Sequence, residues 1–328
     1  MNIGIVGNGM IVPDFLNAAA KISEIKVQAI CGREKSIEKL ECIAEQYNIE
    51  KIYLNYDEML QNKHIETVYV ALPNNLHYKY AKEALLAGKN VILEKPFASN
   101  YKEAEELVNI AAEKRLYLFE AISNIYFPNY EKVRELIPQL GDIKIVELNY
   151  SQYSSRYDAF KKGEILPVFN TKMSGGALMD LNVYNIHFIT GLFGKPQNVH
   201  YFANIENNID TSGILIMEYP HFKCSAIGAK DCKAPLCINI QGDKAYIHSS
   251  SPANVFSEFD FAYNDGKSES FTLNIEKERL FYELKEFVKM VENDEYDRNI
   301  EQMNHSLVVM EILDSARNQA GIEIQGIS

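Results

Sequence analysis

Short apolar runs alternate with helical stretches through the first 120 residues, and this order limits the fold more than any other feature of the chain. The apolar runs occupy residues 3–6, 26–31, 51–54, 67–72, 91–93 and 116–120. The stretches between them have the lengths and apolar spacing of helices. Because parallel strands need a crossover connection, strands separated by helices predict a doubly wound parallel α/β sheet.

A glycine turn follows the first apolar run directly. The order of strand, Gly7-Asn8-Gly9 and helix is that of a dinucleotide-binding turn. The first glycine allows the tight turn, and the second lets a pyrophosphate approach the helix N-terminus. Val12 stands where the pattern has its third glycine, and a glycine turn without a phosphate is the alternative. The expected cofactor-binding residues of this turn are Gly7, Asn8, Gly9, Met10 and Ile11.

The residues after the second run indicate which cofactor is preferred. An NAD site usually has an acidic residue at the end of this strand, which binds the ribose hydroxyls. No acidic residue precedes Glu34 here, whereas Arg33 follows the strand and suits a 2′-phosphate. We therefore expect NAD(P) as cofactor with NADP favoured; a solvated loop arginine is the alternative.

The fifth run ends abruptly in Glu94-Lys95-Pro96. In open α/β sheets, ligands bind beyond the carboxyl ends of the strands. A lysine at such a position is partly removed from water, so it releases its proton more readily and suits proton transfer. The alternative for Lys95 is a lysine that merely lies in a solvated loop.

The fourth run also ends in residues that would face a cofactor, Leu72, Pro73 and Asn74. Asn74 is expected to hydrogen-bond a ribose or an amide. His77, at the start of the next helical stretch, would hold a proton near the cofactor or simply cap its helix.

From residue 124 the pattern changes to an α+β domain with a large, mostly antiparallel open sheet. Strand patterns occur at 144–150, 198–204, 213–219, 223–228, 236–242, 245–248, 259–263 and 270–274, with few helices between them. Helices are expected at 129–137, 278–292 and 302–320. We predict domains at 1–123 and 124–328, with the terminal helices free to pack back on the first. A sheet with one uncovered face favours a homodimer or a dimer of dimers.

A stripe of polar side chains lies in the segment SGGALMDLNVYNIHFITG, residues 174–191. Asp180, Tyr184 and His187 fall at i, i+4 and i+7, on one face of a helix. Such groups on an otherwise apolar helix are costly unless each has a partner. They are either satisfied polar groups at a surface between domains or, with Lys95 across a cleft, a proton-relay site.

Composition excludes several classes of function. The 328 residues carry a formal net charge of −12, which argues against non-specific nucleic-acid binding. No apolar run approaches the roughly 18 residues that span a membrane, and the start MNIGIVGNG lacks the basic region of a secretion signal. Five cysteines without a C-x-x-C pair favour reduced thiols in the cytoplasm over disulfides or a metal site.

Taken together, the glycine turn, ALPNNLHYKYAKEALLAGKNVILEKP and GGALMDLNVYNIH resemble the Gfo/Idh/MocA oxidoreductases in order and spacing, over essentially the whole chain. The resemblance implies a nicotinamide-binding domain followed by a domain whose open sheet commonly mediates dimerisation. It also implies that Glu94 and Lys95 form the family's E-K-P motif and bind the cofactor, with Lys95 beside the nicotinamide and the substrate oxygen.

In the second half, Asp180 matches the family's acidic residue and Tyr184 its acid/base position. A tyrosine there, where many members have histidine, resembles the dihydrodiol-dehydrogenase and glucose–fructose oxidoreductase branches. Ile125 replaces an arginine frequent in such relatives. Arg156 lies in the polar and aromatic stretch YSQYSSRYD, where it would bind an anionic group of the substrate, with a surface loop arginine the alternative. His187 is the other expected substrate contact.

The interpretation is an NAD(P)-dependent dehydrogenase or reductase of CH–OH groups, acting on a sugar, a polyol or a related carbonyl/alcohol compound. Lys95, Tyr184 and Asp180 are the expected catalytic residues, and the proton donor is either Tyr184 or Lys95. Two alternatives belong to other classes: a non-catalytic NAD(P) sensor, and an NAD-using lyase or hydrolase with transient oxidation. A small molecule is the expected partner, rather than nucleic acid or a membrane.

Overall fold

The computed structural model describes residues 1–323 and divides them into two compact units. The first unit contains Met1–Ala121 and Glu278–Leu307; the second contains Ile122–Lys277 and the described residues from Val308 onward. The division therefore lies close to the expected boundary after residue 123, but it assigns part of the C-terminal chain to the first unit.

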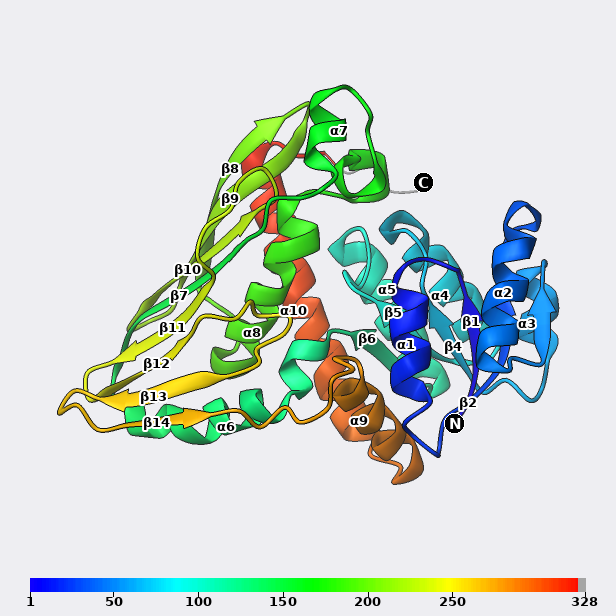
Figure 1. The fold of residues 1–328 in the computed structure, drawn as a ribbon, viewed down its shortest axis with the longest axis horizontal. Helices are drawn as coiled ribbons and strands as arrows, with labels where there is room; N and C mark the ends of the chain where they lie inside the picture. The colour runs from blue at the N-terminus through cyan, green and yellow to red at the C-terminus, as the bar shows by residue number, and fades with distance from the viewer. Residues whose placement is uncertain (324–328) are drawn as a thin grey trace. The chain divides into compact units, whose positions relative to one another are not determined.

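A parallel sheet of six strands forms the centre of the first unit (Figure 1). Its strands are β1 (Asn2–Val6), β2 (Lys26–Cys31), β3 (Lys51–Tyr53), β4 (Thr67–Val70), β5 (Asn90–Glu94) and β6 (Leu118–Ala121). Their order is β3-β2-β1-β4-β5-β6, with every pair parallel. This is the doubly wound Rossmann arrangement, so the expected fold of this half is confirmed.

Helices α1 to α5 lie between these strands along the chain, and α9 joins the unit from the C-terminal part of the chain. They are α1 (Ile11–Ala19), α2 (Ile37–Tyr47), α3 (Tyr56–Gln61), α4 (His77–Leu86), α5 (Tyr101–Lys114) and, from the C-terminal chain, α9 (Phe281–Glu292); short 3₁₀ turns are η1 (Glu34–Ser36) and η2 (Asn74–Leu76). Local signals account for several helix ends. The Asn100 side chain accepts the Glu103 N–H at 2.9 Å, and the Glu103 carboxylate accepts the Ser99 N–H at 3.0 Å, which caps α5.

Long-range contacts explain why residues 278–307 belong to the first unit. The Phe287 ring of α9 stacks on Phe119 of β6, with 4.3 Å between ring centroids. The fully buried Asn299 side chain donates to the Leu118 carbonyl at 3.0 Å and accepts the Leu118 N–H at 3.2 Å. Asn299 lies in α10 (Tyr296–Ala320), which begins before the expected residue 302. This polar first part of α10 carries tertiary hydrogen bonds that no apolar spacing would reveal.

A mixed sheet of eight strands forms the second unit. Its strands are β7 (Ile143–Ser151), β8 (Asn198–Glu206), β9 (Ile209–Glu218), β10 (Lys223–Ala229), β11 (Cys237–Gly242), β12 (Ala245–Ser249), β13 (Phe259–Tyr263) and β14 (Ser268–Phe271). Their order is β14-β13-β12-β11-β7-β10-β9-β8. Only β7 and β10 pair in parallel, which confirms a large, mostly antiparallel sheet.

Few helices accompany this sheet. They are α6 (Pro128–Leu136), α7 (Tyr157–Lys161), α8 (Val183–Phe193) and the part of α10 after Leu307, with the π-helical turn η7 (Leu178–Asn182) and 3₁₀ turns η3 (Ser123–Tyr126), η4 (Ile137–Leu140), η5 (Pro167–Phe169) and η6 (Thr171–Met173). Within this unit, Figure 1 shows α6, α8 and α10 on one side of the sheet. Side chains such as those of Leu148 and Ala226 lie on the buried face of the sheet. Phe202 and Ile214 are paired in register on neighbouring strands and are 66% and 42% exposed.

Candidate active site

The glycine turn in the first unit has the shape of a phosphate cradle. Gly7 has φ +117°, and a Cβ atom at this position would lie 2.1 Å from the Ala71 carbonyl oxygen, so only glycine fits. A Cβ on Gly9 would meet only the Ala71 oxygen, at 3.9 Å, which leaves open space beside the backbone. The turn leads to the N-terminus of α1, where the Met10 side chain does not cap the helix. Backbone N–H groups beside open space fit the pyrophosphate of a dinucleotide.

Arg33 is exposed just after β2, at the start of the η1 turn. The Ser36 hydroxyl donates to the Arg33 carbonyl at 2.8 Å and so fixes the backbone there. The Arg33 side chain forms no salt bridge with any residue that the structure describes. Its guanidinium group fits a 2′-phosphate.

The residues after β4 divide between two roles. Leu72 and Asn74 are half-buried and Pro73 is exposed, as expected for residues that border a ligand. His77, however, is fully buried, with Nδ1 2.9 Å from the Pro96 carbonyl oxygen and Nε2 2.8 Å from the Leu72 carbonyl oxygen. Burial lowers the pKa of His77. Both ring nitrogens therefore bridge the backbone after β4 to the backbone after β5, and a contact between His77 and the cofactor stays a prediction.

Lys95 is half-buried at the carboxyl end of β5, next to a cis peptide bond to Pro96. Glu94 beside it is buried and accepts hydrogen bonds from the Tyr69 hydroxyl and the Lys95 backbone N–H. The Glu94 carboxylate therefore supports the backbone that carries Lys95 from inside the sheet. Glu94 is 9% exposed, and its expected contact with the cofactor stays a prediction.

A cluster of buried carboxyl groups lies around Glu94 in the same unit. Glu120 of β6 and Glu283 of α9 are 5% and 1% exposed, and Arg279 is among the charges that act on the cluster. Burial raises the pKa of Glu94, and burial together with the neighbouring Glu94 and Glu120 raises the pKa of Glu283 well above its usual range. The sequence analysis did not include Glu283, which comes from a helix almost two hundred residues after the strand that it supports.

In the second unit, the segment with the polar stripe is not one regular α-helix. Asp180 lies in the π-helical turn η7, and α-helical geometry begins only at Val183. The expected spacing of Asp180, Tyr184 and His187 on a single α-helical face is therefore wrong, because the wider π turn changes the angle between Asp180 and the residues that follow it.

Asp180 has a charged partner that the sequence analysis missed. The Lys230 ammonium group, whose side chain is 4% exposed, donates to Asp180 Oδ2. Lys230 follows directly after β10, and its Nζ lies 5.6 Å from the centroid of the Phe169 ring. Lys230, like Lys95, lies at the end of a strand. The strand pattern at 223–228 is followed by no motif comparable to Glu94-Lys95-Pro96, so the sequence does not indicate Lys230 as a functional residue.

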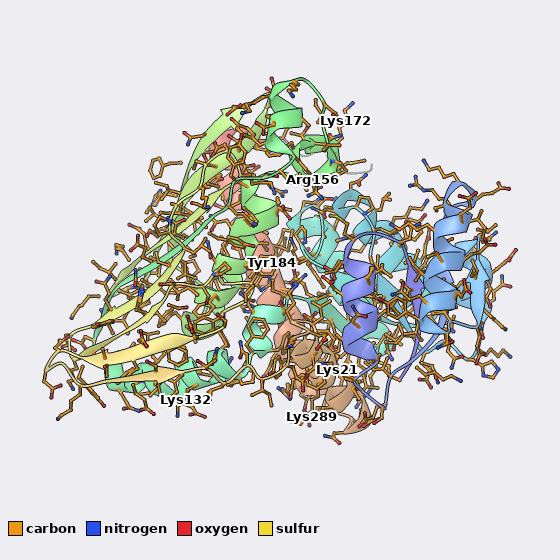
Figure 2. All side chains as sticks on the ribbon, in the orientation of Figure 1. Lys21, Lys132, Arg156, Lys172, Tyr184 and Lys289 are labelled. Carbon is orange, nitrogen blue, oxygen red and sulfur yellow. The ribbon has the colours of Figure 1, made fainter. Side chains whose placement is uncertain are left out.

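Tyr184 and His187 face different surroundings on α8, where Figure 2 shows Tyr184. The Tyr184 side chain is 6% exposed, its ring centroid lies 6.4 Å from that of Tyr150, and its carbonyl accepts the Asn124 amide at 2.8 Å. His187 is fully buried. α8 is buried along residues 183–190, and the expected contact between His187 and the substrate stays a prediction.

Arg156 is half-buried at the start of α7, as Figure 2 shows, and its backbone N–H donates to the Ser154 hydroxyl at 3.3 Å. This position is compatible with the expected contact to an anionic group but does not test it. Within residues 1–323, no cluster of histidine, cysteine, aspartate or glutamate has the arrangement of a metal site. In the same range, no helix combines the length and apolar character needed to cross a bilayer.

Comparison with known protein families gives two matches in order along the chain. The model described as "Oxidoreductase family, NAD-binding Rossmann fold" (GFO_IDH_MocA) matches residues 1–121. The model described as "GFO/IDH/MocA C-terminal domain" matches residues 130–248. The two matches follow the two units of the structure and the motifs from which the resemblance was drawn.

Individual relatives extend this similarity over the whole length. The chain is 32% identical over 328 residues, 98% of each protein, to a scyllo-inositol 2-dehydrogenase (NADP(+)), IolU, of Bacillus subtilis. It is 28% identical over 232 residues, 68% of this chain and 67% of that protein, to a trans-1,2-dihydrobenzene-1,2-diol dehydrogenase of Mus musculus. The crystal structure of KijD10, a 3-ketoreductase from Actinomadura kijaniata in complex with NADP and TDP-benzene, has a TM-score of 0.84 at 21% identity, with 97% of both chains covered. At that identity the crystal structure supports the fold alone.

Proposed function

Because the chain belongs to the Gfo/Idh/MocA family of NAD(P)-binding oxidoreductases, we propose that it transfers a hydride between NADP(H) and a CH–OH carbon of a cyclic polyol, a sugar or a related carbonyl/alcohol compound. The observation that carries this proposal is the pairing, in one parallel sheet, of an open glycine cradle after β1 with a half-buried lysine after β5. Ligands of open α/β sheets bind beyond these strand ends, so a dinucleotide held by Gly7 and Gly9 extends toward Lys95.

The chain's own residues would bind the cofactor and handle the proton. A bound nicotinamide supplies or accepts the hydride at its C4 atom. The backbone of the glycine turn would hold the pyrophosphate, and Leu72, Pro73 and Asn74 would border the cofactor after β4. Tyr184 would donate a proton to the substrate oxygen or accept one from it, with Lys95 as the alternative proton carrier, and Asp180 would accept a hydrogen bond from a substrate hydroxyl.

The preference for NADP(H) rests on Arg33 and on the absence of an acidic residue at the end of β2. One relative supports it, because IolU is named as an NADP(+)-dependent enzyme. The substrate class follows the sequence relatives, which are named for an inositol and for a cyclic dihydrodiol.

The test is a screen of the purified protein against inositols, other cyclic diols, monosaccharides and nucleotide sugars, with both NADP(H) and NAD(H). We expect a change in NADPH absorbance with at least one cyclic polyol or its ketone. Tight cofactor binding without turnover of any compound would favour the sensor. Product formation without a net absorbance change would favour the lyase or hydrolase.

We also propose a cytoplasmic homo-oligomer. The five cysteines are all free thiols, as expected in a reducing compartment. On the second unit's sheet, Phe202 and Ile214 lie side by side on the face opposite α8, and apolar side chains exposed on such a face commonly pack against another copy. Light scattering should give a mass above the 37.4 kDa of one chain, and a Phe202→Asp variant should lower that mass. A wild-type protein that is monomeric at micromolar concentration would contradict this proposal.

A further inference from the structure

The π-helical turn η7 is attached to the sheet of its own unit at several points. The Leu178 N–H donates to Asp210 Oδ2 at 2.6 Å, where β9 begins. The Asn182 amide donates to the Ala226 carbonyl at 3.0 Å, and the Asn185 amide to the Ile227 carbonyl at 3.0 Å, both on β10. π turns are rare and occur frequently at functional sites, so what holds this one in place bears on the function of Asp180.

The turn η7 and the segment before it also lie too close to the sheet for any side chain at two glycine positions. A Cβ on Gly228 would lie 2.9 Å from the Asn182 Cβ, and a Cβ on Gly176 would lie 2.1 Å from Asp210 Oδ1. Glycine on each side therefore lets the turn lie directly on the ends of β9 and β10. The backbone around Asp180 has little freedom to move, but the direction of its carboxylate still depends on a side-chain partner.

Lys230 is that partner, and its own backbone is fixed on both sides. The Lys230 N–H donates to the Thr211 carbonyl at 2.8 Å, and the Lys230 carbonyl accepts the Ser154 N–H at 2.8 Å. Its ammonium group is buried, which is costly without a charged partner, and it donates to Asp180 Oδ2. The side chain of Lys230 is only 4% exposed, whereas that of Asp180 is 27% exposed. A ligand in solution can therefore reach Asp180 but not Lys230.

We propose that Lys230 is a positioning residue, which acts through Asp180 to set the direction of a carboxylate that selects substrates with a hydroxyl group at one defined position. This inference rests on the proposed function and specifies its substrate contact. An ionised carboxylate only accepts hydrogen bonds, so the matching group of the substrate must be a donor, and in a polyol or sugar that donor is a hydroxyl. Because one Asp180 oxygen is bound to a fixed ammonium group, the carboxylate does not turn freely to meet a hydroxyl elsewhere on the ring.

The kinetic test compares Lys230→Met, Lys230→Arg and Asp180→Asn with Lys233→Met, which removes an exposed lysine three residues further on and serves as the control. For Lys230→Met we expect KM for the best polyol found in the screen to rise about 10- to 100-fold, as for a lost hydrogen bond to a charged group. We expect a smaller change in kcat, and an affinity for NADPH within about twofold of the wild-type value. Lys230→Arg should recover most of the loss, and Lys233→Met should match the wild type. An unchanged KM in Lys230→Met would overturn the proposal.

A double variant covers the case in which Lys230→Met alone fails to fold because Asp180 has lost the ammonium group of Lys230. Asp180→Asn combined with Lys230→Met leaves no unpaired charge at the turn. Under the proposal this double variant has the same KM as Asp180→Asn alone, because Lys230 acts only through Asp180. A KM clearly above that of Asp180→Asn would show that Lys230 acts by another route and would refute the proposal.

A measurement without substrate separates this proposal from the proposed function. Crystal structures of the wild type and of Lys230→Met, both without substrate, should differ in the direction of the Asp180 carboxylate, with the hydrogen bond between Leu178 and Asp210 kept. If the wild type turns over no polyol or sugar but the carboxylate turns in the variant, only the substrate assignment fails. If the carboxylate keeps its direction without Lys230, the positioning role is wrong whatever the substrate.

Discussion

The two lysines at strand ends, Lys95 after β5 and Lys230 after β10, show how differently the two units build a functional position. Lys95 belongs to a contiguous motif, and its neighbour Glu94 supports the backbone that carries it. Lys230 has its partner Asp180 fifty residues earlier in the chain, and the contact exists only because β10 lies beneath η7. A contiguous motif thus identifies Lys95 in the sequence, whereas the contact of Lys230 with a distant segment leaves no such signal.

The buried carboxyl groups of the two units extend this comparison. In the first unit Glu94, Glu120 and Glu283 gather beneath the end of β5, and in the second Asp210 supports the start of η7. Burial raises the pKa of Asp210 to about 6, although the Leu178 N–H and the Tyr201 hydroxyl both donate to it. Each unit therefore contains a buried carboxyl group with a raised pKa close to the segment that carries its candidate catalytic residues. In the first unit this segment is the end of a parallel strand, and in the second it is a π turn.

The largest expected effects are losses of turnover in variants of Tyr184 and Lys95, and they show which of the two residues carries the proton. Groups that act in general acid–base catalysis contribute about 10²- to 10⁴-fold. Tyr184→Phe should lose that much turnover, and Lys95→Ala should lose at least as much, because Lys95 either carries the proton or supplies the positive charge beside the substrate oxygen. Steady-state rates at saturating NADPH measure the loss, and fluorescence titration should show unchanged cofactor affinity.

Lys102→Ala, an exposed lysine on α5, is the control for the loss of a charge near β5. Near-normal turnover of Tyr184→Phe would assign the proton to Lys95. Full activity in both Lys95→Ala and Tyr184→Phe would remove both candidate regions from the chemistry.

The next effect concerns Asp210 and pH. Because its folded-state pKa of about 6 lies above the ordinary value of 3.8, the native protein keeps a proton that the unfolded chain has lost. This contribution to stability is present below about pH 4 and is lost as the pH rises through 6. The amide side chain of the Asp210→Asn variant does not titrate. Between pH 4 and pH 7, the free energy of unfolding of the variant should therefore rise by about 3 kcal/mol relative to that of the wild type. Urea denaturation at several pH values measures the difference, and a constant difference would contradict the expectation.

Arg33→Ala is expected to weaken NADPH binding by roughly 10- to 150-fold, as for the loss of a charged hydrogen bond worth about 1.5–3 kcal/mol. The affinity for NADH should stay the same, because NADH lacks the 2′-phosphate. Titration of both cofactors measures this, with the exposed neighbour Lys35→Ala as the control. Tighter binding of NADH than of NADPH by the wild type would remove the argument for NADP(H).

A further pH-dependent effect is expected for Glu283→Gln. A neutral amide resembles the protonated carboxyl group that burial and the neighbouring carboxylates favour at this position. Wild-type stability should fall as the pH rises above the unfolded-state pKa of about 4.3, because the native pKa of Glu283 is raised, and the variant should lack this part of the fall. Thermal melts across pH 4–8 measure the difference. If the variant melts in parallel with the wild type at every pH, Glu283 is ionised in the native protein.

By itself the sequence determined the strands and helices of the first unit, the glycine turn, the position of Lys95 and the family. These features depend on apolar spacing, turn residues and capping pairs such as Asn100 with Glu103, which act over a few residues and are readable in order. Only the tertiary structure decided that His77 and His187 are buried, that η7 interrupts the helical stripe, that Asn299 ties α10 to β6, and that Lys230 and Glu283 stand behind the candidate catalytic residues. The reason is physical: the contacts of Lys230, Asn299 and Glu283 join segments 50 to about 190 residues apart in the chain, and no local pattern records which of them meet.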